Sequence, residues 1–200
     1  MPFIGLTGNI GAGKTTVLRL FENLGAHTIN ADRIVHEILK KPQIIKKLSA
    51  VLGRKILTKR DSKVLINKKR MADVIFNNLE KRRAAEKIIH PYVLKSAKAI
   101  KRKILTKDRN AIIVFEVPLL FEKGYEKIFD KVIVVYCSKS IALQRLRKYG
   151  FSEEQALKRM RAQMPISKKK AGADFLIRNN LNISDTNLQV KKIFKKLQIS

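Results

Sequence analysis

Short apolar runs alternate with helical patterns along most of the chain. The runs at residues 3–6, 26–29, 111–115, 131–136 and 175–177 are rich in apolar and β-branched residues, which is typical of buried strands. The intervals between them carry apolar residues at helical spacing. Strands that alternate with helices predict a parallel sheet with helices on both faces. We therefore predict an α/β fold of three layers built on a parallel five-stranded sheet.

Local signals set the ends of several predicted helices. A helix over residues 14–24 precedes Gly25, and glycine commonly follows a helix end. The sequence Ser152–Gln155 fits a capping box and predicts a helix that continues to about residue 163. Residues 42–110 are mostly helical in pattern and very basic. Within them Pro91 is placed to begin a helix, because proline is tolerated in the first turn.

Length and cysteine content limit the class of protein. A chain of 200 residues suits one domain, so we expect residues 1–200 to form a single domain. The single cysteine, Cys137, cannot form an internal disulfide, which favours a reducing compartment and a cytoplasmic location. Cys137 ends an apolar run and is interpreted as a core residue rather than a reactive thiol. No apolar run approaches the ~20 residues of a membrane-spanning helix, so we expect no membrane association.

The chain is strongly basic, with 44 Lys and Arg against 16 Asp and Glu and a formal net charge of +28. Such an excess fits a nucleic-acid-binding surface, but it also fits solvated lysines on a protein whose substrates are polyanions. The lysine pairs are scattered along the chain and form no basic arm. We therefore do not favour a nucleic-acid partner.

A phosphate-binding motif follows the first predicted strand and opens the first helix. Residues 8–15 match G-x-x-x-x-G-K-[ST] at every position. The glycines let backbone N–H groups turn toward phosphate oxygens, and the helix N-terminus adds about half a positive charge. Lys14 would reach the β- and γ-phosphates, and the Thr15 hydroxyl would bind Mg²⁺. The loop residues predicted to bind ATP are Gly8, Gly11, Ala12, Gly13, Lys14, Thr15 and Thr16.

Asp32 directly follows the second predicted strand and precedes a predicted helix at residues 33–39. In an open α/β sheet the carboxyl ends of the strands line the active crevice. A carboxylate there can accept a proton from a hydroxyl that attacks the γ-phosphate. An aspartate in front of a helix is also a common N-cap. Position alone leaves these two interpretations equal.

Glu116 ends the third predicted strand. An acid in this place either assists Mg²⁺ or is a solvated strand end. The segment 117–122 that follows is apolar for a loop beside an active site. It either packs in the core or forms a wall, with Pro118 and Leu119, against an apolar part of a ligand. Both pairs of alternatives remain open.

Taken together, the motifs resemble those of the dephospho-CoA kinase family. The resemblance extends from residue 4 to about residue 180. In chain order it rests on Leu6-Thr7 before the phosphate loop, Asn30-Ala31-Asp32, Ile89-His90-Pro91, Val117-Pro118-Leu119-Leu120-Phe121-Glu122, Ala162-Gln163-Met164-Pro165, and Ala173-Asp174 with Ile177 and Asn179. The phosphate loop is shared by many families, whereas this combination is much narrower.

The resemblance implies a P-loop kinase that uses ATP and Mg²⁺ to phosphorylate the ribose 3′-hydroxyl of dephospho-CoA, the last step of CoA biosynthesis. It implies that the catalytic residues are Asp32, as the general base, and Lys14. It also implies that residues 33–108 form a helical acceptor-binding region and that residues 138–172 form a lid. Spacing alone would put the lid arginines on solvated helix faces. The implied contacts to the acceptor are His90, Lys68, Pro118 and Leu119, those to ATP from the lid are Arg145 and Arg159, and those to the metal are Thr15 and Glu116.

The chain departs from the family pattern in three places. Asn67 and Lys68 stand where the family usually has Asp-Arg, an arginine expected near Tyr149 is missing, and Asn30 replaces the first aspartate of Asp-Ala-Asp. Arg147 or Lys148 is the expected substitute in the lid. Two alternatives remain, namely another metabolite kinase, such as a nucleoside monophosphate kinase, and a nucleic-acid-binding P-loop ATPase. We expect a monomer or a weak homo-oligomer.

Overall fold

The computed structural model describes residues 2–199, and the chain divides into two compact units. The first consists of residues 1–30 and 103–200, and the second of residues 31–102. The phosphate-binding motif lies in the first unit, and Asp32 lies in the second.

A parallel sheet of five strands forms the centre of the first unit, which confirms the predicted sheet. The strands are β1 (Phe3–Thr7), β2 (His27–Asn30), β5 (Ile113–Glu116), β6 (Lys131–Tyr136) and β7 (Phe175–Arg178). Their order is β2-β5-β1-β6-β7, and every neighbouring pair is parallel. The central position of β1 explains why all its residues are buried. Leu6 of β1 pairs with Glu116 of β5, so these two strands end side by side.

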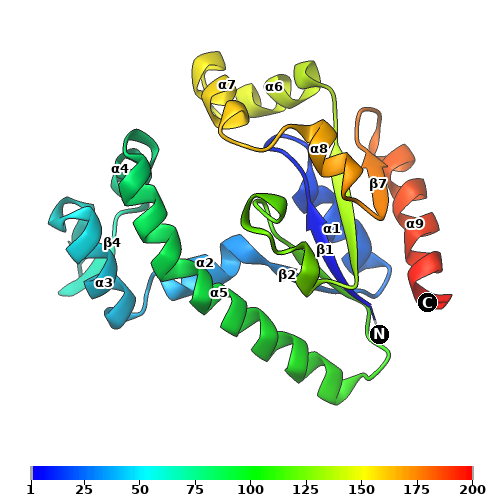
Figure 1. Cartoon of the computed structure of the whole chain (residues 1–200), viewed down its shortest axis with the longest axis horizontal. Helices are drawn as coiled ribbons and strands as arrows, with labels where there is room; N and C mark the ends of the chain where they lie inside the picture. The colour runs from blue at the N-terminus through cyan, green and yellow to red at the C-terminus, as the bar shows by residue number, and fades with distance from the viewer. Residues whose placement is uncertain (1, 200) are drawn as a thin grey trace. The chain divides into compact units, whose positions relative to one another are not determined.

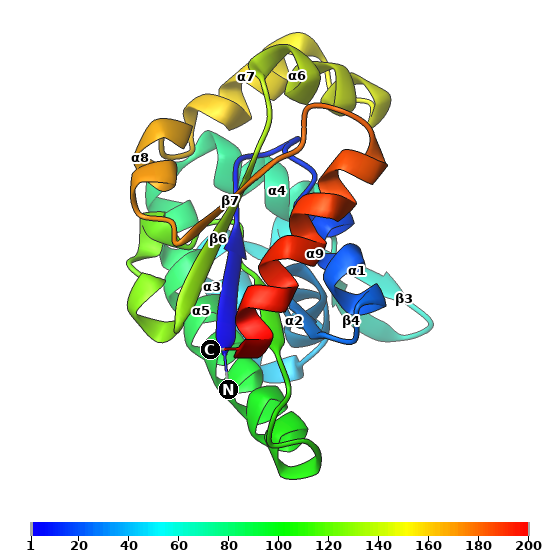
Figure 2. The same ribbon diagram turned by 90° about the vertical axis from the view of Figure 1, so that its right-hand side faces the viewer.

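One face of the sheet is covered by the helices α1 (Lys14–Asn23) and α9 (Ile183–Ile199). Ile4 and Leu6 of β1 point to this face and belong to the same buried cluster as Val17 of α1. Figure 2 shows both helices on the same side of strands β1, β6 and β7. Burial of these apolar side chains is the main favourable term for this half of the core.

The opposite face of the sheet carries an aromatic cluster. The ring of Phe3 lies with its centroid 6.3 Å from that of Phe115 and 4.9 Å from that of Phe129. Gly5 points to the same face. A Cβ atom on Gly5 would lie 2.6 Å from Cδ1 of Leu120 and 2.8 Å from Cδ2 of Phe129, so a larger residue here would displace both side chains.

Three helices follow β6, namely α6 (Lys139–Lys148), α7 (Glu153–Arg161) and α8 (Ile166–Ala171). The predicted capping box is present at the start of α7. The Ser152 hydroxyl accepts a hydrogen bond from the Gln155 N–H, and the Gln155 carboxamide accepts one from the Ser152 N–H, both at 3.2 Å. Figure 2 shows α8 on the side of the sheet opposite α1 and α9.

The second unit is helical apart from one hairpin, which the sequence pattern did not reveal (Figure 1). Its elements are α2 (Ala31–Ile38), α3 (Pro42–Leu52), β3 (Leu57–Arg60), β4 (Lys63–Ile66), α4 (Lys68–Asn77) and most of α5 (Leu79–Lys107). The strands join through Asp61 and Ser62, with φ angles of 48° and 61°. Two successive positive φ angles mark a type I′ turn, which usually carries Asn-Gly or Asp-Gly. Because the turn sequence here is Asp-Ser and lies within a lysine-rich segment, the sequence pattern did not indicate a hairpin.

The helix α5 runs unbroken through Pro91, so the prediction that a helix begins there is wrong. A proline inside a helix costs ~3 kcal/mol, because it lacks an N–H and crowds the carbonyl four residues earlier. Ala85, Ile89 and Ala97 are buried on both sides of the proline, and this burial offsets the cost. The helix begins instead after Asn78, whose side chain accepts a hydrogen bond from an N–H of the first turn at 2.9 Å.

The 29 residues of α5 exceed the ~20 that a membrane-spanning helix needs. Ten of them are Lys or Arg, as the sequence of the helix shows. Neither α5 nor any other helix within residues 2–199 has both the length and the apolar character to cross a membrane.

Asp174 joins the strand β6 to the turn before β7. Its carboxylate accepts a hydrogen bond from the Val132 N–H at 2.8 Å and another from the Lys131 ammonium at 2.9 Å. Partial burial would raise the pKa of this carboxyl, but the hydrogen bonds from Val132 and Lys131 outweigh burial and lower the pKa below its ordinary value of 3.8. A lowered pKa means that the ionised carboxylate stabilises the folded state.

We expect Asp174→Asn to lower the melting temperature at pH 7 by more than it does at pH 3. Because the pKa falls on folding, the stabilisation is present above the unfolded-state pKa and is lost as the pH drops through the folded-state value. Thermal melts at both pH values, with Asp61→Asn as a control at a side chain that is 90% exposed, measure the difference. An equal loss at both pH values would contradict this role for Asp174.

Candidate active site

The phosphate loop is shaped by two close approaches of its backbone, one to strand β6 and one to the side chain of Asn179. Gly8 has a φ of 148°, and a Cβ atom there would lie 2.1 Å from the carbonyl oxygen of Val135 in β6. Gly13 is the N-cap of α1 with a φ of 88°, and a Cβ atom there would lie 2.1 Å from the side-chain nitrogen of Asn179. Any other residue at these two positions would displace the loop.

The outer side of the loop is held by donors from α6 and from the segment after β7. The Arg145 guanidinium donates hydrogen bonds to the carbonyl oxygens of Gly11 and Ala12, each at 3.3 Å, and to that of Asn179 at 3.0 Å. The Asn179 amide donates to the Ala12 carbonyl at 2.8 Å and accepts from the buried Thr186 hydroxyl at 3.0 Å. Arg145 is therefore not a solvated helix charge. It is half-buried against the loop.

The inner side of the loop keeps the features that bind phosphate. The helix α1 begins at Lys14, so its N-terminal N–H groups and its dipole end at the loop. The Lys14 ammonium lies 3.3 Å from the carbonyl oxygen of Asn9, to which it donates a hydrogen bond. The structure thus brings a cation and a helix N-terminus together at the predicted ATP site.

Glu116 is buried, with 3% of its surface exposed, so its interpretation as a solvated strand end is wrong. The Thr15 hydroxyl lies 3.3 and 3.4 Å from its two carboxylate oxygens, and the Asn30 amide donates to one of them at 2.8 Å. Burial of a carboxylate is costly unless donors compensate it. These three side chains come from the ends of β5 and β2 and from the start of α1, so the fold places a hydroxyl and a carboxylate together at the loop.

The connection between α7 and α8 is tied to the phosphate loop on one side. The Gln163 side-chain oxygen accepts a hydrogen bond from the Ile10 N–H at 2.8 Å. The Asn9 amide donates to the Met164 carbonyl at 3.4 Å. The end of the predicted lid is therefore coupled to the loop residues 9 and 10.

The same connection is tied to a buried ion pair on its other side. Glu122 accepts a hydrogen bond from the Met164 N–H at 3.0 Å, and its carboxylate lies 2.8 Å from the Lys169 ammonium. The Lys169 side chain is fully buried. The sequence analysis missed this lysine, because nothing in the run Lys168–Lys170 distinguishes the one that is buried.

The remaining lid residues lie on α6 and α7. The Arg159 guanidinium lies over the Phe151 ring, 4.7 Å from its centroid, a cation–π contact that keeps the side chain half-buried. Arg147, one of the two substitutes expected for the missing arginine, forms an ion pair with Glu153. Tyr149 is 79% exposed.

The residues of segment 117–122 do not all fit the same interpretation, core packing or a wall against a ligand. Leu120 is fully buried, which fits core packing. Pro118 and Leu119 are half-buried, and the Pro118 carbonyl accepts a hydrogen bond from the Thr7 hydroxyl at 3.3 Å. Their contact with a ligand stays a prediction.

Cys137 packs half-buried against the core, which confirms its interpretation as a core residue. Burial raises the pKa of its thiol, although Arg145 and Lys14 act in the opposite direction. The thiol therefore stays protonated and unreactive near neutral pH.

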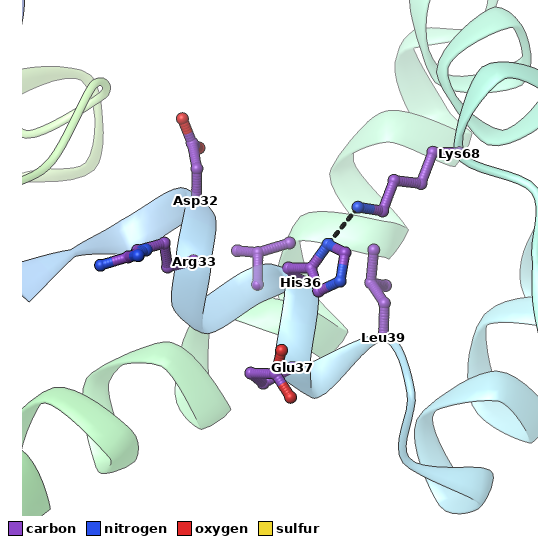
Figure 3. A pocket seen from close by; sticks show the side chains of 7 residues that line it. Asp32, Arg33, His36, Glu37, Leu39 and Lys68 are labelled. Atoms are coloured by element: carbon purple, nitrogen blue, oxygen red, sulfur yellow. Dashed lines mark hydrogen bonds between the residues drawn. The ribbon is translucent and has the colours of Figure 1, made fainter. Parts of the chain in front are cut away.

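In the second unit, Asp32 is the second residue of α2, so its interpretation as an N-cap is wrong. The helix begins at Ala31, two residues earlier than expected, so Asn30 and not Asp32 directly precedes it. The exposed Asp32 carboxylate lies on one wall of a groove of about 710 Å³. Val35, His36 and Leu39 follow it at helical spacing, as Figure 3 shows for His36 and Leu39.

Lys68, from the first turn of α4, closes the groove and contacts the Nδ1 atom of His36 (Figure 3). The preceding residue, Asn67, is the N-cap of α4 and accepts a hydrogen bond from the Arg70 N–H at 3.0 Å. His36 was missed by the sequence analysis, although its position four residues after Asp32 puts both on one helix face. His90 lies half-buried within α5, so it is not a helix-start residue, and its contact with the acceptor stays a prediction.

The central strand of the parallel sheet leads into a G-x-x-x-x-G-K-T loop, and the neighbouring strand β5 ends in a buried acid. These features define a P-loop kinase fold. A sequence model of the dephospho-CoA kinase family matches residues 2–185. The chain therefore belongs to the dephospho-CoA kinase family, as its motifs predict. This membership does not favour the two alternatives, another metabolite kinase and a nucleic-acid-binding ATPase.

Individual relatives agree with this assignment. A dephospho-CoA kinase of Aquifex aeolicus is 37% identical over 198 residues, which cover 98% of each chain. The solved structure of a dephospho-CoA kinase from Campylobacter jejuni is 30% identical, covers 98% of this chain and 97% of its own, and superposes with a TM-score of 0.70. TT1252 from Thermus thermophilus is 26% identical with a TM-score of 0.79 and covers 98% and 97% of the two chains.

We expect Lys169→Met to lower the free energy of unfolding by ~3–5 kcal/mol, because it leaves the Glu122 carboxylate without its buried cation. Urea denaturation measures the loss. The double variant Glu122→Gln/Lys169→Met removes both charges and should recover most of it. A loss below about 1 kcal/mol in the single variant, as for an exposed ion pair, would contradict the anchoring role of this pair.

Proposed function

We propose that this protein transfers the γ-phosphoryl group of ATP to the ribose 3′-hydroxyl of dephospho-CoA, giving CoA and ADP. The observation that supports the proposal most directly is the phosphate loop with Thr15 beside the buried Glu116, in a chain of the dephospho-CoA kinase family. The bond between the 3′-oxygen and the γ-phosphorus forms as the bond from the γ-phosphorus to the bridging oxygen breaks. The hydroxyl proton leaves to a base.

The loop residues 8–16 hold the phosphates of ATP. Backbone N–H groups and the N-terminus of α1 bind phosphate oxygens, and Lys14 neutralises the charge on the β- and γ-phosphates. Arg145 and Asn179 already bind the carbonyl oxygens of Gly11 and Ala12, so these two carbonyl groups are held in place before ATP binds.

Thr15 and Glu116 fit a site for Mg²⁺. Both offer oxygen atoms, which this ion prefers, and the hydroxyl and carboxylate are already 3.3 Å apart. Thr15 would hold the ion directly, and Glu116 would hold it or its water ligands. When bound, Mg²⁺ supplies positive charge to the β- and γ-phosphate oxygens.

Asp32 acts as the general base. Its carboxylate is exposed on the wall of the groove, where an acceptor hydroxyl can reach it. Lys68 and His90 contribute to the binding of dephospho-CoA, and Pro118 and Leu119 contact an apolar part of it.

Residues 138–172 act as the lid over bound ATP. Arg145 and Arg159 supply positive charge from α6 and α7, and the bond between Gln163 and Ile10 couples the lid to the loop. Exclusion of water by a lid strengthens the interaction of these arginines with the transferring group.

An acceptor assay tests the proposed reaction. With ATP and Mg²⁺ the protein should convert dephospho-CoA to CoA, and adenosine should be a far poorer acceptor, because the remote parts of dephospho-CoA help to orient its hydroxyl. Lys14→Ala is the matched control and should reduce turnover by at least ~10²-fold in a folded protein. Faster phosphorylation of AMP or CMP than of dephospho-CoA would overturn the proposal.

We expect Asp32→Asn to reduce kcat by ~10²–10⁴-fold, because an amide cannot accept the proton. Its melting temperature and ATP affinity should stay close to wild type, since the lost helix-dipole interaction is worth only ~0.3–1 kcal/mol. Asp73→Asn removes the same charge from α4 and should leave kcat unchanged. If the two variants turn over at the same rate, Asp32 is not the base.

A further inference from the structure

The groove beside Asp32 has a second polar feature whose function is not explained by the general base. Helix α2 contributes both polar and apolar side chains to one wall, and His36 lies one turn after Asp32, about 5.4 Å further along the helix axis. Figure 3 shows the side chains of His36 and Lys68 pointing toward one another. The whole groove lies within the second unit.

The chemistry of the two side chains fixes the proton on the imidazole. A lysine ammonium has three N–H donors and no acceptor. The Nδ1 atom of His36, which contacts Lys68, therefore acts as the acceptor in this contact. A neutral imidazole that accepts at Nδ1 carries its proton on Nε2. His36 therefore presents an N–H donor at Nε2.

The pair consequently offers donors and a positive charge. The nearest acid on the same helix, Glu37, is hydrogen-bonded to Lys40 at 2.6 Å, and this hydrogen bond lowers the pKa of the Glu37 carboxyl. A ligand group that complements several donors and a positive charge is an anion with oxygen acceptors. A ribose hydroxyl fits less well, because it also needs an acceptor for its own proton.

We propose that His36 is an acceptor-binding residue whose Nε2–H donates a hydrogen bond to a phosphate oxygen in the diphosphate of dephospho-CoA, with Lys68 supplying the charge. The inference rests on the proposed function. It gives the groove two roles one helical turn apart, because Asp32 takes the proton of the ribose hydroxyl and the His36–Lys68 pair holds the anionic part of the same nucleotide.

Two substitutions of His36 separate this role from a structural one. His36→Gln keeps an oxygen that can accept from Lys68 and an N–H that can donate to phosphate. His36→Leu keeps the bulk but neither polar atom. We expect His36→Leu to raise the KM for dephospho-CoA by ~10–100-fold with the KM for ATP unchanged, as for the loss of a charge-assisted hydrogen bond. The Gln variant should stay within a few-fold of wild type.

His27→Leu is the matched control, since it removes an exposed histidine from β2 and should leave both KM values unchanged. If His36→Leu fails to fold, Lys68→Met replaces it, because loss of the ammonium should weaken binding of the same phosphate. Unchanged KM values in folded His36→Leu or Lys68→Met would overturn the inference.

Adenosine tests the assignment to phosphate. It has the ribose hydroxyls but no phosphate, so the ratio of kcat/KM between wild type and His36→Leu should be close to one with adenosine and large with dephospho-CoA. An equal loss with both acceptors would overturn the assignment. If wild type turns over no dephospho-CoA, the proposed function fails, and calorimetric binding of dephospho-CoA to wild type and His36→Leu still decides the inference. Weaker binding to the variant supports it, and equal binding overturns it.

Discussion

The rest of the first unit depends on the hydrogen bonds that Arg145 and Asn179 donate to carbonyl oxygens of the phosphate loop. A loop of successive N–H groups that face an anion must direct its carbonyl groups elsewhere, and buried carbonyl groups need donors. Here the donors come from α6 and from the segment that follows β7, both distant from the loop in sequence. Thr186 of α9 in turn fixes the Asn179 amide, so the helix that covers the core also orders the loop. These hydrogen bonds also require glycine at position 13, because only a residue without a side chain lets Asn179 approach the loop.

Glu116 in the first unit and Asp32 in the second show how the same functional group acquires different properties from its surroundings. Glu116 sits at the carboxyl end of a central strand pair, nearly free of solvent contact, and is compensated by the hydroxyl of Thr15 and the amide of Asn30. Asp32 is exposed in the first turn of a helix. A carboxylate fixed by donors in a buried place suits a permanent electrostatic role, whereas an exposed one can exchange protons with substrate and water. The amide of Asn30 can donate a hydrogen bond to Glu116, which a second carboxylate at position 30 could not.

The sequence predicts the sheet and the phosphate loop well because both depend on local patterns. Apolar runs locate the strands, and the loop motif is a direct consequence of phosphate chemistry. The errors arise where tertiary contacts override local preference. Pro91 predicts the start of a helix, yet the helix continues through it because residues on both sides are buried. The hairpin at Asp61 and Ser62 lacks the usual glycine. Lys169 is indistinguishable from adjacent lysines until its partner Glu122, far away in sequence, is known. The burial of Glu116 follows only from the strand order.

The passage of α5 through Pro91 also has a consequence for how this helix opens. Because proline has no N–H, the carbonyl group of Lys87 cannot receive the usual hydrogen bond from four residues later. The ladder of backbone hydrogen bonds is therefore interrupted near the middle of a helix whose buried contacts lie on either side. The neighbouring backbone hydrogen bonds still span the proline, so this turn has one bond fewer than the turns on either side of it and is the place where local opening of the helix should begin. A single ring nitrogen thereby sets the weakest point of an otherwise continuous helix.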